Sequence, residues 1–179
     1  MNHGFGLGDA NALLRVYVAK RPPMQEYAHL YEVQPLCRGE IDSINQACGN
    51  GWRKLFNVYA KLVQALPAAL QPLQQTSPSW QSYRDQHLLQ AGSSTALLFS
   101  APQLETTSNI LHIIAGRTHA KALLAGGLDA QLDWLDHEFA IDKKQRLLVC
   151  PYFDYRQLTN EKLARLCCLI AALGKDSSS

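Results

Sequence analysis

The runs Thr95–Phe99 (TALLF), Asn109–Ala115 (NILHIIA) and Arg146–Cys150 (RLLVC) decide the fold. Each run is short and almost continuously apolar, which is typical of strands that are buried on both faces of a parallel sheet. A fourth run, Leu13–Ala19 (LLRVYVA), is rich in β-branched and aromatic residues and stops at Lys20-Arg21-Pro22-Pro23. This run therefore also predicts a strand.

Helical patterns lie between these runs. The clearest is Trp52–Leu66, where apolar residues recur at i, i+3, i+4 and i+7 up to Pro67. The other predicted helices are residues 40–47, 79–90 with Ser79 as N-cap, 118–125, 129–139, and 160–173 with Gly174 at C′. As an alternative, residues 139–149 suit a β-hairpin. Together these elements predict an α/β fold, a three-layer sandwich with a mainly parallel central sheet of about four strands and helices on both faces.

The length of 179 residues predicts a single domain. We assign residues 1–174 to this domain and residues 175–179 to a disordered tail.

Composition argues against several classes of protein. The net charge is +2 and the pI about 8.3, which is less basic than most nucleic-acid-binding domains, although a local basic groove is still compatible with it. The five cysteines are odd in number and lack C-x-x-C spacing, which favours a reducing compartment. No signal-peptide pattern and no membrane-length apolar run occur. We therefore expect a soluble cytoplasmic protein that does not bind membranes.

Any ligand site is expected just beyond the carboxyl ends of the strands, because open α/β sheets bind ligands there. The segments that follow the predicted strands are rich in Arg, His, Tyr and Ser, which suits an anion or a planar ring. The candidate residues are Arg21, Ser100, Gly116, Arg117, Thr118, His119, Tyr152, Asp154, Tyr155 and Arg156.

The turn Gly116-Arg117-Thr118-His119 is the most specific of these segments. It follows a strand and opens a helix, so free N–H groups and the helix dipole favour an anion there. Arg117 adds a bidentate donor, and Thr118 is a candidate cap. The same four residues also suit an ordinary turn, with glycine at the bend and with solvated Arg and His side chains.

Two further clusters have chemical potential. Cys150, with His119 as base and Asp154 as orienting group, is a candidate nucleophile, and a buried core thiol is the alternative. On a helix, Asp133 and His137 would be i, i+4 neighbours, as in some metal sites. Apolar residues interleave them and H-E-x-x-H is absent, which favours a solvated helix face, so we predict neither a metal nor a cofactor.

The order of the strand segments resembles that of the uracil-DNA glycosylase superfamily. The corresponding segments here are Val16–Pro23, Leu97–Ser100, Ile113–Ala120 (IIAGRTHA) and Leu147–Tyr152 (LLVCPY). The resemblance implies the fold of that superfamily and a pocket for a flipped base, which needs a polar edge reader and an aromatic wall. The chain as a whole also resembles a small bacterial protein family of unknown function.

The functional residues of the superfamily do not carry over to this chain. Lys20 and Arg21 stand where the water-activating acid is expected, Ser100 where the base-reading asparagine is expected, and Cys150 where the histidine is expected. The resemblance therefore implies a non-catalytic or cryptic relative that binds a nucleotide or single-stranded nucleic acid. The alternatives are a hydrolase or transferase that uses Cys150 or His119, and a homodimeric interaction module that uses its tryptophans.

Overall fold

A computed structural model describes residues 4–67, 71, 77–105 and 109–176. In these residues the strands form one eight-stranded sheet in the order β3-β1-β4-β2-β5-β8-β7-β6. The strands are β1 (Gly6–Gly8), β2 (Leu14–Tyr17), β3 (Val33–Gln34), β4 (Thr95–Leu98), β5 (Leu111–Ala115), β6 (Asp133–Trp134), β7 (Ala140–Asp142) and β8 (Leu147–Cys150).

The centre of the sheet is parallel. Strands β4, β2, β5 and β8 pair in parallel as neighbours, and they correspond to the four apolar runs of the sequence. Strand β1 pairs antiparallel with β4, and β7 pairs antiparallel with both β8 and β6. The prediction of a mainly parallel α/β sheet is confirmed, but the short strands at the two edges extend it beyond the four predicted strands.

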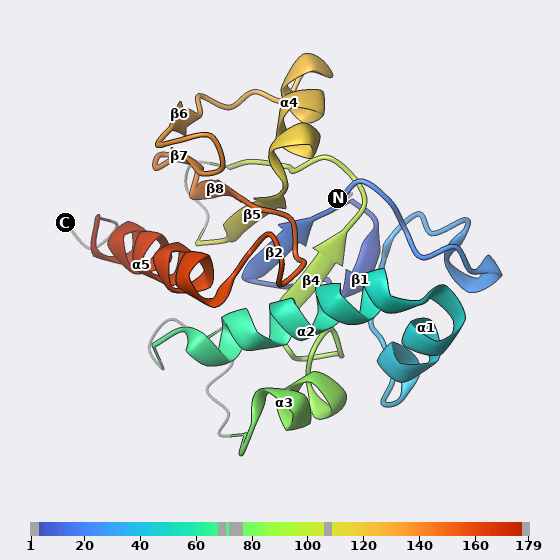
Figure 1. Ribbon diagram of the computed structural model, residues 1–179. Coiled ribbons are helices and arrows are strands. Elements are labelled where there is room, and N and C mark those ends of the chain that lie inside the picture. Colours follow the sequence, from blue (N-terminus) through green and yellow to red (C-terminus); the bar gives the residue numbers. More distant parts are fainter. Residues whose placement is uncertain (1–3, 68–70, 72–76, 106–108, 177–179) are drawn as a thin grey trace.

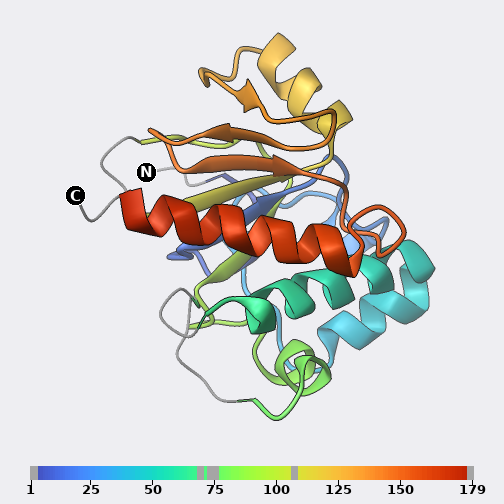
Figure 2. The same cartoon turned by 60° about the vertical axis from the view of Figure 1, so that its left-hand side comes forward.

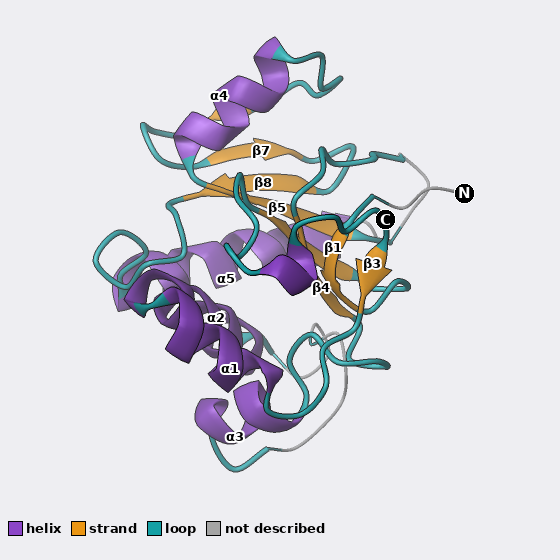
Figure 3. Ribbon diagram, turned by 90° about the vertical axis from the view of Figure 1, so that its right-hand side faces the viewer, coloured by secondary structure: helices purple, strands orange, loops and turns teal. Residues whose placement is uncertain are grey.

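The helices in the described residues are α1 (Glu40–Cys48), α2 (Asn50–Ala65), α3 (Trp80–Gln86), α4 (Arg117–Ala125) and α5 (Asn160–Asp176), with a 3-10 turn at Gln25–Tyr27. Side chains of α1, α2, α3 and α5 pack into one core on the sheet face that carries Val16 and Ile113. Side chains of α4 pack into a second, smaller core on the face that carries Tyr17 and Ile114. Figures 1, 2 and 3 show α4 set apart from the other four helices.

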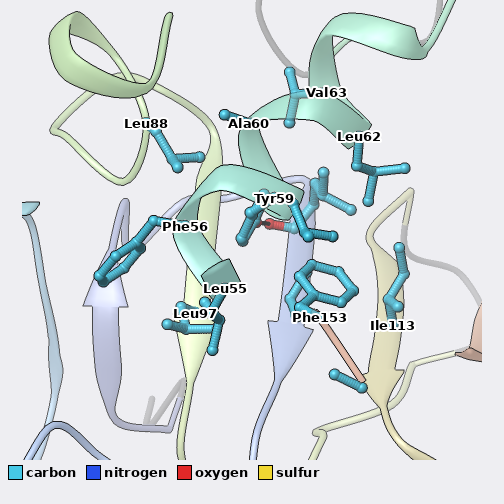
Figure 4. Close-up of a cluster of buried hydrophobic side chains, with 14 of the residues drawn as sticks. Leu55, Phe56, Tyr59, Ala60, Leu62, Val63, Leu88, Leu97, Ile113 and Phe153 are labelled. Carbon is cyan, nitrogen blue, oxygen red and sulfur yellow. Dashed lines mark hydrogen bonds between the residues drawn. The ribbon is translucent and has the colours of Figure 1, made fainter. Parts of the chain in front are cut away.

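Helix α2 contributes seven buried residues to the first core. Leu55, Phe56, Tyr59 and Leu62 are fully buried over the sheet, as the helical periodicity predicts (Figure 4). The Tyr59 hydroxyl donates a hydrogen bond to the Ala96 carbonyl oxygen at 2.9 Å, so the buried polar atom is satisfied. This hydrogen bond links α2 directly to β4.

Three local predictions are wrong. Residues 129–139 do not form a helix, because they contain β6 and the turn into β7, so the hairpin alternative for the following residues is confirmed. Helix α3 ends at Gln86 instead of Gln90, although Ser79 caps it by accepting a hydrogen bond from the Ser82 N–H at 3.1 Å. Helix α5 continues to Asp176, so Gly174 is not its C′ residue. Residues 177–179 of the predicted tail lie outside the described residues.

Candidate functional site

The four parallel strands end at one edge of the sheet. Strand β4 lies on one side of β2, whereas β5 and then β8 lie on the other side. The strand order of the sheet therefore reverses between β2 and β5. In open α/β sheets such a reversal opens a crevice outside the carboxyl ends of the strands. The predicted site segments after these strands are therefore brought to the same edge.

A cavity of about 540 Å³ lies at this edge, and we call it the rim pocket. This volume falls within the roughly 300–1,000 Å³ that is typical of small-molecule sites. The pocket is lined by Ala19 after β2, residues 115–119 and Ala122 of the β5–α4 turn and α4, His137 and Glu138 before β7, and Pro151, Tyr152 and Gln157 after β8.

The N-terminus of α4 opens on the rim pocket. Gly116 is the N-cap residue with a φ of 103°, and its N–H donates to the Cys150 carbonyl oxygen at 2.8 Å. Within the described residues no side chain makes a capping hydrogen bond to this helix, so the predicted cap at Thr118 is wrong. The positive φ explains why glycine suits this bend, since a Cβ built at Gly116 would only make ordinary contact with the Tyr152 Cβ at 3.8 Å. The first-turn N–H groups therefore have no capping acceptor from a side chain.

Arg117 links α4 to the far wall of the pocket. Its guanidinium donates to the His137 carbonyl oxygen at 2.9 Å and lies 4.8 Å from the centre of the Trp134 ring. The Lys121 ammonium lies 4.6 Å from the same ring. Two cations thus share one aromatic side chain beside the pocket, which keeps this corner positively charged.

His119 lines the rim pocket and has one polar atom without a partner. Its Nε2 atom is buried and has no hydrogen-bond partner in the part of the chain that the structure describes. Burial lowers the pKa of His119, and the positive end of the α4 dipole disfavours the imidazolium further. A neutral imidazole at this position can donate or accept one hydrogen bond per ring nitrogen, depending on its tautomer.

The far wall is the turn of residues 135–139. The Asp136 carboxylate accepts hydrogen bonds from the Glu138 and Phe139 N–H groups, each at 2.8 Å, and it is paired with Arg165 of α5. The Arg165 hydrogen bond, supported by these two N–H donors, lowers the pKa of Asp136 to about 2. Lys162 of α5 pairs with Glu138 at 2.7 Å. These contacts hold the turn against α5.

The hypothesis of a metal site at Asp133 and His137 assumed that these residues lie on one helix, which the structure does not contain. Asp133 is in strand β6 and His137 is in the turn, so they are not i, i+4 neighbours on a helix. No group of three or more His, Cys, Asp or Glu side chains within residues 4–67, 71, 77–105 and 109–176 is arranged to hold a metal ion.

The structure gathers half of the ten candidate residues into the rim pocket. These five are Gly116, Arg117, Thr118, His119 and Tyr152. The other five, Arg21, Ser100, Asp154, Tyr155 and Arg156, do not line it.

Arg21 and Ser100 support the loops beside β4. Arg21 donates to the Tyr27 and Ala28 carbonyl oxygens at 3.0 and 2.7 Å, and the Ser100 hydroxyl accepts from the Phe5 N–H at 3.0 Å. These contacts give both side chains a structural role at this edge.

The remaining candidates lie on the loop that follows β8. Asp154 pairs with Arg156 at 3.2 Å and with Lys54 of α2 at 3.9 Å, and these hydrogen bonds and charges lower the pKa of Asp154. Tyr155 is exposed on the same loop. This part of the loop faces α2 instead of the rim pocket.

Seven lining residues were not among the ligand-binding candidates from the sequence: Ala19, Ala115, Ala122, His137, Glu138, Pro151 and Gln157. Ala19 and Gln157 lie near segments that were selected, but nothing in their residue types marks them. His137 and Glu138 were considered only as part of a helical acidic cluster, because the turn that brings them to the rim was not predicted. The motif D-H-E before an apolar residue is compatible with an Asp-capped turn, and this is the signal that could have found them.

Cys150 is predicted to be unreactive in the folded protein. It is fully buried on the face under α2 and α5, and burial raises the pKa of its thiol above the ordinary range. Iodoacetamide, followed by peptide mass spectrometry, should modify the exposed Cys37 and Cys168 and leave Cys150 unmodified until denaturant is added. Alkylation of Cys150 at the rate of Cys37 would restore the nucleophile hypothesis, which its burial otherwise removes.

Comparison with known proteins gives one match. The model of a family described as a family of unknown function (DUF6942) matches residues 5–171. No curated protein and no solved structure matches the chain significantly. In the described residues, no helix is long and apolar enough to span a bilayer.

Proposed function

The chain belongs to the DUF6942 family of unknown function, and from the geometry of the rim pocket we propose that it binds a nucleotide or a nucleic-acid fragment. The observation that carries the proposal is His119, which lines this pocket in the first turn of α4 and whose buried Nε2 atom has no hydrogen-bond partner in the described residues. An unsatisfied buried polar atom is unfavourable by about 1–3 kcal/mol, and a ligand group that pairs with it relieves this cost.

The parts of a nucleotide match different walls of the pocket. Free N–H groups at the start of α4, together with Arg117, suit the phosphate. The Tyr152 ring, half-buried beside Gly116, offers an aromatic surface for the base, and His119 and Gln157 offer hydrogen bonds for its edge.

We further propose that the fold is a three-layer, uracil-DNA glycosylase-like arrangement and that the protein is a non-catalytic or cryptic relative of that superfamily. The four segments that carry the resemblance overlap β2, β4, β5 and β8 and continue past their carboxyl ends, and these strands are parallel neighbours that end at one edge. No carboxylate lines the pocket on the β2 side, where Ala19 contributes. A cytoplasmic location is part of the proposal, since all five cysteines are free thiols, and a bacterial origin is part of it through the resemblance to a bacterial family.

Catalysis through His119 is a second candidate function. His119 and Glu138 line the same pocket, and a neutral imidazole is able to accept a proton. Release of base or phosphate from a bound nucleotide, lost in His119→Gln, would support it. A turnover that persists in this variant would exclude His119 as the base.

A homodimer that forms through tryptophans has less support. The ring centres of Trp52 and Phe99 lie 6.5 Å apart, and the Lys61 ammonium lies 5.0 Å from the centre of the Trp80 ring. The Arg117 guanidinium lies over the Trp134 ring. None of the three is among the exposed large hydrophobic side chains. Sedimentation equilibrium at high protein concentration tests dimerisation directly, and a monomer there would exclude this alternative.

Replacement of Arg117 with alanine is predicted to weaken nucleotide binding about tenfold or more, because a charge-assisted hydrogen bond to phosphate is lost. Calorimetric titration with nucleoside 5′-monophosphates measures the effect. Affinity should also fall as salt is raised, since phosphate contacts release counterions. Arg38→Ala is the matched control, because Arg38 is exposed and lies outside the rim pocket. Absent or salt-independent binding of the wild-type protein would overturn the proposed function.

A further inference from the structure

A second polar cavity of about 490 Å³ adjoins the loop that follows β8. It is lined by α1, α2 and α3 and, from the loop, by Tyr155. The same loop contributes Tyr152 and Gln157 to the rim pocket, so residues 152–157 take part in both cavities. We call the second cavity the Tyr155 pocket.

Amide side chains give the Tyr155 pocket its chemistry. Asn45, Gln46, Asn50 and Asn57 all line it, and carboxamides pair well with the donor and acceptor edges of bases. The Asn45 Oδ1 atom is buried and has no hydrogen-bond partner in the described residues. The Tyr155 pocket and the rim pocket thus each have a lining residue with a buried polar atom that lacks a partner in the described residues.

The rest of the lining consists of cations, an aromatic ring and one carboxylate, that of Asp42, which accepts a 2.8 Å hydrogen bond from the Gln46 Nε2 atom. Arg53 and Lys54 of α2 line it, and Arg84 is held there by a 2.8 Å hydrogen bond to the Asn57 Oδ1 atom. The Tyr155 ring is 54% exposed, with the Lys54 ammonium 5.0 Å from its centre. Exposed aromatic rings beside basic side chains are the usual platforms for unpaired bases.

One loop supplies an aromatic residue to each of the two pockets. Tyr152 of the rim pocket and Tyr155 are three residues apart in the chain, so their Cα atoms are separated by at most about 11 Å. Each pocket is lined by a tyrosine, by at least one cation and by a residue with an unpartnered buried polar atom. A ligand with repeating base and phosphate units matches this repetition, whereas a single nucleotide fills only one pocket.

We propose that the Tyr155 pocket holds a neighbouring nucleotide of the strand whose first nucleotide occupies the rim pocket, so that the ligand is a single-stranded oligonucleotide. This inference rests on the proposed function of the rim pocket. Tyr155 stacks on the second base, the amides of α1 and α2 pair with its edge, and Arg53 contacts the connecting phosphate.

Binding of thymidine 5′-monophosphate, dT2, dT4 and dT6 to the full chain tests the proposal by calorimetry. Affinity is expected to rise at least tenfold from the mononucleotide to dT4. The double variant Tyr155→Ala/Arg53→Ala should lower the affinity for dT4 about tenfold or more, since stacking of one base contributes about 1–3 kcal/mol. The same variant should bind the mononucleotide as the wild type does. Tyr31→Ala/Arg38→Ala is the matched control, because Tyr31 is 79% exposed and neither residue lines these two pockets.

The outcomes separate the two proposals. If mononucleotides bind and the affinity does not rise with oligonucleotide length, the proposal for the Tyr155 pocket is wrong. The proposed function of the rim pocket is then unaffected. If the affinity rises with oligonucleotide length equally in the double variant and the wild type, the proposal for the Tyr155 pocket is also wrong. Failure of every ligand to bind would overturn both. Since Tyr155 and Arg53 are exposed, circular dichroism should show that the variant is folded.

Discussion

Replacement of Phe153 with alanine is expected to lower the free energy of unfolding by about 3–5 kcal/mol, the range typical of a large cavity left by a buried aromatic ring. Phe153 is fully buried, and its ring meets the Tyr59 ring edge-on at 5.9 Å (Figure 4). It belongs to the loop after β8 and packs into the core under α2. This ring therefore fixes the loop that supplies lining residues to both pockets.

Urea denaturation measures this effect, and Phe153→Leu is its control. Leucine retains most of the apolar contact, so the control should lose less than about 1.5 kcal/mol. Nucleotide affinity should fall in the alanine variant more than in the leucine variant, because the loop loses its anchor. A loss below about 1 kcal/mol for alanine would show that other contacts fix the loop.

Acidification from pH 7 to pH 4 is expected to lower the stability of the wild-type protein by about 3 kcal/mol through His112 alone. His112 is 1% exposed, and its Nδ1 atom lies 2.6 Å from the Tyr17 hydroxyl. Burial, followed by the charges of Arg15 and Arg146, lowers the pKa of His112 from 6.5 to about 4. The unfolded chain thus binds more protons than the folded protein between these two pH values, and stability falls as the pH drops through that window.

The comparison with His112→Gln isolates this effect. Glutamine does not titrate, so the difference in unfolding free energy between the two proteins should shrink or reverse from pH 7 to pH 4. Asp136 and Asp154 also have lowered pKa values, but they are common to both proteins and cancel in the difference. Parallel stability profiles for the two proteins would contradict the prediction.

The four central strands could be predicted because each is buried on both faces, and an uninterrupted apolar run is the direct result of that burial. The edge strands lack this signal. Strand β1 has the sequence GLG, and a Cβ added to Gly8 would lie 2.4 Å from the Thr95 carbonyl oxygen. Glycine in β1 therefore allows its backbone to approach β4 closely, and strand propensities do not predict such a contact.

The candidate site also has a part that could be predicted from the sequence and a part that could not. The segment Gly116–His119 was predictable, because a glycine between a strand and a helix places free N–H groups at the carboxyl edge wherever the strand lies in the sheet. Asp154, Tyr155 and Arg156 were selected for the same position after a strand, but the burial of Phe153 turns their part of the loop toward α2.

The sequence by itself thus determined the class of the fold, the four parallel strands, the amphipathic helix α2 and the edge of the sheet where the rim pocket lies, because local periodicity and burial encode them. Only the tertiary structure decided which residues meet at that edge. The turn of residues 135–139 reaches the rim through ion pairs with Lys162 and Arg165, some 25 to 30 residues further along the chain. Contacts between side chains so distant in sequence leave no periodic pattern, so His137 and Glu138 became visible as lining residues only in the folded chain.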